Sequence, residues 1–158
     1  MDLTKLSLGD KVIAGSGLAL FVFSFFNWLG VKVSSGPLEF SESKGAWSFT
    51  LTLFAVLIGI AMVVLVALKA FGVDLPALGS ATWGQVLLGL GTVSFVFVLI
   101  KLIVGPNLSN AADIPGVDKT RGIGIFLGLI ATAGLAAGGY LRMQEDKAGG
   151  GAPPPPAA

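Results

Sequence analysis

Cysteine and histidine are both absent from this chain. Without cysteine there can be no disulfide, no thiolate nucleophile and no cysteine metal site. Without histidine there are no imidazole metal ligands, and the side chain that most often acts as a general base is missing. We therefore expect no metal, no cofactor and no catalytic residue, and we expect that the protein is not an enzyme.

Charge is also scarce. Charged residues make up 12% of the 158 residues and hydrophobic residues 54%, whereas soluble domains carry roughly 25% charged residues. So little polar surface cannot cover a soluble globule, and the composition indicates a membrane protein. The net charge of +1 gives no argument for binding nucleic acid.

Long hydrophobic runs are what the chain has in abundance. Four segments carry no charge: Val12–Val31, Gly45–Leu68, Leu75–Ile100 and Gly122–Leu141. The first residues of the third run indicate a turn, so spans are expected at about 12–31, 46–68, 82–104 and 122–141. About 20 apolar residues are needed to cross ~30 Å of hydrocarbon. The segments are apolar all round, unlike the helices of a soluble bundle. The prediction is an all-α, four-helix transmembrane bundle over residues 1–143.

Residues near the ends of these runs support that interpretation. Ser7-Leu8-Gly9-Asp10 fits a loose capping box ahead of the first helix. Trp28, Trp47 and Trp83 lie near expected helix ends, where the headgroup region favours indole rings. Residues 144–158 are rich in Gly, Pro and Ala and are expected to form a disordered tail.

An even number of spans places both termini on one side of the membrane. The positive-inside count is a tie, with five Lys or Arg residues on each side. The connections around Lys32–Lys44 and Gly105–Arg121 are longer and more polar than the second connection, as outward loops often are. We therefore expect a multi-pass protein of the plasma membrane with cytoplasmic termini.

Lys101 is the only formal charge inside an expected span. A charge within the membrane is by default a functional hypothesis. Lys101 lies about one turn from the end of the third helix, from where its four-carbon stem can carry the ammonium to the interface. Snorkelling is favoured because no carboxylate is expected at the same depth.

The fourth helix carries a row of small residues, which we call the glycine face. At 100° per residue these residues fall on one arc: Gly124, Gly128, Ala131, Gly134 and Gly138. Small residues let a second helix approach closely, which is how helices associate in lipid. The glycine face is expected to pack either inside the monomer's own bundle or between subunits.

Three short motifs support a family resemblance. They are the opening Lys5–Lys11, the aromatic end Phe25–Trp28 and the later Gly45-Ala46-Trp47. Together they resemble small four-helix integral membrane proteins of high-GC Gram-positive bacteria, the actinobacteria. The resemblance covers roughly the first 50 residues and the number of helices. It implies a bacterial plasma membrane and carries no activity or site residue with it.

Three classes of function are compatible with these features. The first is an accessory or scaffold subunit of a cell-envelope membrane complex, bound to a membrane-protein partner or to copies of itself. The second is an oligomeric transporter or channel for a small solute, which would use polar groups on the second and third helices. The third, an enzyme, would have to draw its carboxylates from Glu39 and Glu42 or from Asp113 and Asp118.

Overall fold

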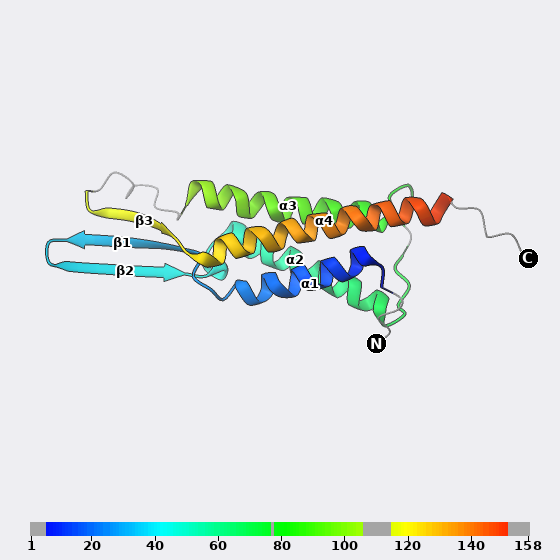
Figure 1. The fold of residues 1–158 in the computed structure, drawn as a ribbon, viewed down its shortest axis with the longest axis horizontal. Coiled ribbons are helices and arrows are strands. Elements are labelled where there is room, and N and C mark those ends of the chain that lie inside the picture. Colours follow the sequence, from blue (N-terminus) through cyan, green and yellow to red (C-terminus); the bar gives the residue numbers. More distant parts are fainter. Residues whose placement is uncertain (1–5, 77, 106–114, 152–158) are drawn as a thin grey trace, which may run out of the picture.

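The structure is a computed structural model that describes residues 6–76, 78–105 and 115–151. Its elements, in chain order, are α1 (Leu8–Phe23), β1 (Leu29–Ser35), β2 (Leu38–Lys44), the short helix η2 (Ala46–Ser48), α2 (Thr50–Ala70), α3 (Trp83–Val104), β3 (Val117–Arg121) and α4 (Ile123–Gly151). The four long helices lie side by side, and the three strands extend from one end of the bundle (Figure 1). We call this end of the bundle the sheet end. The opposite end, where α1 and α3 begin and α2 and α4 end, is called the terminal end. Four helices, as predicted, are present in the described part of the chain.

The starts of α1 and α3 are set by the residues just before them. At α1, Ser7 Oγ accepts from the N–H of Asp10, and Asp10 Oδ2 accepts from the N–H of Ser7, each at 3.2 Å. Thr82 and Gln85 exchange the same two bonds at α3, at 3.2 and 3.1 Å. These bonds satisfy amides that have no partner within the helix. The capping box predicted at Ser7–Asp10 is confirmed.

Helix length determines which helices can cross a bilayer. Thr50–Ala70, Trp83–Val104 and Ile123–Ala148 are long and apolar enough to do so. α1 has 16 residues, which at ~1.5 Å per residue gives about 24 Å, less than the ~30 Å of hydrocarbon. In the described chain, three helices rather than four therefore meet the criteria for a span.

The predicted span over residues 12–31 is wrong because its uncharged run contains two kinds of structure. α1 ends at Phe23, and the Ser24 hydroxyl donates to the carbonyl of Phe21 at 2.5 Å. The Trp28 N–H then donates to the carbonyl of Lys44 at 2.9 Å, and strand β1 begins. Hydrophobicity alone does not separate a buried strand from a helix, so the uncharged run by itself predicts a single helix.

The strands form an antiparallel sheet in the order β2-β1-β3. Val33 at its centre lies opposite both Phe40 and Val117. A two-residue turn joins β1 to β2. Its Gly36 has a φ of 63°, a backbone angle that residues with a side chain rarely adopt. The all-α prediction is therefore wrong. The signal for the hairpin was present, because apolar and polar residues alternate on both sides of Gly36-Pro37.

The predicted disordered tail is wrong over residues 144–151, which belong to α4. Glu145 Oε1 accepts from the N–H of Gly9 at 3.3 Å, and Asp146 Oδ2 accepts from the N–H of Gly84 at 2.8 Å. Two carboxylates thus cap the first turns of α1 and α3, where a negative charge is favourable. These tertiary bonds hold the last turns of α4. Residues 152–158 lie outside the described part of the chain.

Candidate functional site

The terminal end of the bundle holds a charged cluster formed by Asp10, Lys69, Arg142 and Asp146. Asp10 lies in the first turn of α1 and is 1% exposed. Its Oδ2 lies 2.6 Å from Nζ of Lys69, at the end of α2, and 3.7 Å from Nη1 of Arg142 on α4. Arg142 Nη2 also lies 3.2 Å from Asp146 Oδ1. A buried carboxylate needs such partners, because an unpaired charge away from water is costly.

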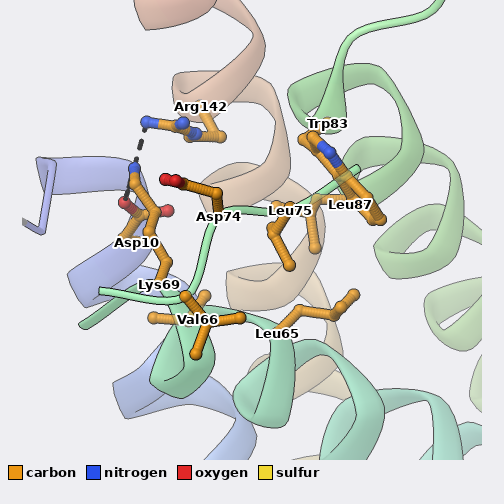
Figure 2. A pocket seen from close by; sticks show the side chains of 10 residues that line it. Asp10, Leu65, Val66, Lys69, Asp74, Leu75, Trp83, Leu87 and Arg142 are labelled. Atoms are coloured by element: carbon orange, nitrogen blue, oxygen red, sulfur yellow. Dashed lines mark hydrogen bonds and ion pairs between the residues drawn. The ribbon is translucent and has the colours of Figure 1, made fainter. Parts of the chain in front are cut away.

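Beside this cluster is a cavity of about 230 Å³. Its apolar wall includes Leu65 and Val66 of α2, Leu87 of α3, and Val73 and Leu75 of the connection between these helices. Its polar wall carries the side chains of Asp10, Lys69, Asp74 and Arg142. Figure 2 shows the Asp74 carboxylate pointing to the side where Lys69 and Arg142 lie, with Trp83 across the cavity. A site with charged and apolar walls suits a small amphiphilic ligand.

The sheet end carries a second exposed feature, which we call the apolar tip. Its residues share one face of the sheet, because Val33 lies opposite Phe40 and Val117 and because Leu38 is two residues from Phe40. Val33, Leu38 and Phe40 are 37%, 60% and 65% exposed. The other face is polar, with Lys32, Ser34, Glu39, Ser41 and Asp118. The apolar tip consists of Val33, Leu38, Phe40 and Val117.

The predicted glycine face lies inside the monomer. A Cβ at Gly124 would lie 2.5 Å from Cδ1 of Trp28, and one at Gly128 would lie 2.5 Å from its Cζ2. Farther along α4, a Cβ at Gly138 would lie 2.7 Å from Cγ1 of Ile13, and Gly134 is in contact with Ser16. Ala131, on the same face, is 5% exposed. Of the two alternatives, the contacts correspond to packing within the bundle, against α1 and Trp28.

Trp28 was expected to present its ring to the headgroup region, but its side chain is fully buried inside the protein. Its Nε1 donates to the carbonyl of Phe23 at 2.7 Å. Trp47 is 40% exposed, and its Nε1 donates to the Ser24 hydroxyl at 2.9 Å. The Trp47 ring lies 6.0 Å from that of Phe25. Trp47 is thus the tryptophan at the sheet end whose position suits an interfacial ring.

Lys101 does not extend to the surface. It is 1% exposed, and its Nζ lies 4.6 Å from the centroid of the Phe49 ring. A cation over an aromatic face is attracted by the ring quadrupole. The snorkelling expectation is wrong because the Lys101 side chain stays buried, with its ammonium against the ring of Phe49, the residue just before α2. Lys101 is therefore part of the packed interior at the sheet end of the bundle, and it is not part of the charged cluster.

Of the two pairs of loop carboxylates considered as catalytic groups, the one whose residues are both described, Glu39 and Glu42, does not converge. Glu39 and Glu42 lie three positions apart on β2, so their side chains leave opposite faces of the strand. Asp118 is exposed on β3, and Asp113 lies outside the described residues. Among the residues that the structure describes, no three potential metal-ligating side chains come together.

Sequence reasoning missed the charged cluster altogether. Asp10 and Lys69 are 59 residues apart, and nothing local links them. One signal was available, because Asp10, Lys69 and Arg142 each lie at the end of an apolar run that an even number of crossings brings to the same side. Their pairing depends on how the helices are arranged around the bundle axis.

No protein-family model matches this chain, and no curated protein matches it. The evidence for a function therefore comes from the chemistry and geometry of the two ends of the bundle.

Proposed function

We propose that the chain is a small accessory or scaffold subunit of a cell-envelope membrane complex and that it binds its partner through the apolar tip. The observation that carries the proposal is the exposure of Phe40 and Leu38 on a sheet that extends beyond the bundle (Figure 1). Exposed apolar patches with a polar surround mark interaction sites. Aromatic residues are enriched at the centres of protein interfaces.

The sheet is suited to water rather than to lipid. Its polar face carries Lys32, Glu39 and Asp118, and Glu42 and Lys119 flank Val31 on the face of the apolar tip. Charges in hydrocarbon are expensive, which favours a sheet outside the bilayer. A partner that covers the apolar tip would remove Phe40 and Leu38 from water. This burial would stabilise the complex by about 25 cal/mol per Å² of apolar area.

The buried polar groups of the bundle support a structural role for the helices. The Ser94 hydroxyl on α3 donates to the carbonyl of Ala55 on α2 at 3.0 Å. The Thr132 hydroxyl donates to the carbonyl of Leu129 at 2.9 Å. These bonds link helices or satisfy the hydroxyl locally. A transporter, the second candidate, would need such groups to line an aqueous pathway.

The proposed location is a bacterial plasma membrane, with the terminal end in the cytoplasm and the sheet outside. The sheet end and the terminal end are separated by the length of the three helices that are long enough to span a membrane. In this orientation the apolar tip would meet extracytoplasmic or membrane-embedded partners of the envelope.

The test is site-specific photocrosslinking in the cells that make the protein. A benzophenone amino acid replaces Phe40 in one variant and Ser41, on the opposite face of the same strand, in the other. Position 40 should give an adduct with a larger membrane protein, and position 41 should give little. Equal adducts at both positions, or none at position 40, would refute the proposed surface.

The size of the adduct separates the two candidate functions. A product larger than two copies of the chain identifies a different partner and supports the accessory subunit. A product of twice the mass, together with solute flux in liposomes containing the purified chain, supports the oligomeric transporter instead.

A further inference from the structure

The cavity at the terminal end presents a balanced set of charges. Lys69 and Arg142 supply two cations, and Asp10 and Asp74 supply two carboxylates. The charges are separated within the wall. Asp10 is buried against Lys69 and Arg142, whereas Asp74 is exposed on the connection between α2 and α3. A wall with separated charges of both signs attracts a ligand with separated charges more than it attracts a simple anion or cation.

The cations keep donors that the cluster does not use. A lysine ammonium has three N–H donors and a guanidinium has five. Lys69 gives one hydrogen bond to Asp10, and Arg142 Nη2 lies 3.2 Å from Asp146. The side chains of Lys69 and Arg142 are 27% and 19% exposed. Asp10 thus holds two cations at the cavity wall while both can still donate to an oxyanion.

A second polar group of the wall, the carboxylate of Asp74, can accept from an ammonium. Asp74 supplies two carboxylate oxygens, and Figure 2 shows them directed to the side of the cavity where the two cations lie. Trp83 lines the cavity across from this group. A ligand with an oxyanion and a primary ammonium a few bonds apart could reach both sets of partners.

The remaining wall is apolar, and part of it comes from α2 and α3, two helices long and apolar enough to span a membrane. Leu65 and Val66 belong to the last turns of α2, and Leu87 belongs to the first turns of α3. The volume of about 230 Å³ is below the ~300 Å³ at which sites for drug-sized ligands begin. The cavity therefore suits a headgroup, with any attached chains leaving along apolar side chains such as Leu65.

We propose that this cavity binds a zwitterionic phosphoamine, a phosphate joined to a primary ammonium, as in the headgroup of an ethanolamine phospholipid. Lys69 and Arg142 hold the phosphate, Asp74 accepts from the ammonium, and Asp10 positions the two cations. The same chemistry exists in a membrane lipid and in free phosphoethanolamine. The site lies at the end opposite the apolar tip, so it is independent of the partner surface proposed above.

Native mass spectrometry of the full chain in detergent tests the proposal. The chain is mixed with ethanolamine, choline or glycerol phospholipids that carry identical acyl chains. The ethanolamine lipid should be retained roughly tenfold better than the choline lipid, because a quaternary ammonium cannot donate to Asp74 and one charge-assisted hydrogen bond corresponds to about that factor. Free phosphoethanolamine that displaces the bound lipid would show that the headgroup alone is recognised, and no displacement would identify the lipid as the ligand.

Substitutions of Asp74 locate the effect. Asp74→Asn should abolish the preference for ethanolamine over choline, and Asp74→Glu should retain most of it. Asp118→Asn, the same change at an exposed position on the sheet, should leave the preference intact. The proposal is overturned if the unaltered chain retains the ethanolamine and choline lipids equally, if it prefers the glycerol lipid, or if Asp74→Asn has no effect.

Discussion

The indole ring of Trp28 lies against the backbone of Gly128 on α4, in space that any side chain at Gly128 would occupy. Trp28 is fully buried and lies in the chain between α1 and β1. Its backbone N–H donates to the carbonyl of Lys44 at the end of β2. The contact therefore joins three parts of the fold: the end of α1, the base of the sheet and α4. Glycine at position 128 makes this junction possible because it leaves room for a ring.

Replacing Gly128 by alanine should lower the free energy of unfolding by about 1–3 kcal/mol, because a methyl group would overlap the Trp28 ring and the packed site must shift. The matched control is Gly89→Ala on α3, where a Cβ would meet nothing within 4 Å. That change should be neutral or stabilise by up to ~1 kcal/mol. Thermal unfolding in detergent measures both. Equal effects of the two changes would contradict the role of Gly128.

Asp10→Asn should destabilise the terminal end by roughly 1–3 kcal/mol, because it removes the buried charge that pairs with Lys69 and Arg142. The loss stays below that of a fully buried pair, since both cations are partly exposed and can turn to water. Asp118→Asn, on the exposed surface of β3, should change stability by less than about 0.5 kcal/mol. Unfolding in detergent compares the two. An Asp10 variant as stable as the Asp118 variant would show that the cluster does not hold the bundle together.

Lys101 and Phe49 should be energetically coupled, because the ammonium lies over the ring in a buried setting. Lys101→Met and Phe49→Leu each remove one side of the contact while keeping an apolar side chain. A double-mutant cycle of unfolding free energies should give a coupling of roughly 1–2 kcal/mol. If the effects of the two changes simply add, the ring does not stabilise the ammonium.

Cysteine accessibility should distinguish the two ends of the bundle. The native chain has no cysteine, so a single introduced thiol reports without background. Ser41→Cys on the sheet should react with a membrane-impermeant maleimide in intact cells, and Ser80→Cys on the connection between α2 and α3 should react only after the cells are opened. Both positions are exposed in the structure. The reverse pattern would place the sheet in the cytoplasm.

The number of helices and the starts of α1 and α3 followed from the sequence alone. Long apolar runs predict helices because every backbone hydrogen bond of a helix is made within the segment. Capping is equally local, since Ser7 and Asp10, or Thr82 and Gln85, are three residues apart. The glycine face of α4 was also visible in the sequence, because the helical period fixes which residues share a face.

The tertiary structure decided which distant residues these local elements contact. Val12–Val31 divides into a helix and a strand because Trp28 and Leu29 pair with residues of β2, and apolar composition is compatible with either structure. Residues 144–151 are helical because Glu145 and Asp146 cap α1 and α3. The pairing of Asp10 with Lys69, and the fit of Trp28 over Gly128, depend on which helices are neighbours. Those choices arise from packing between residues far apart in the chain, which no local pattern specifies.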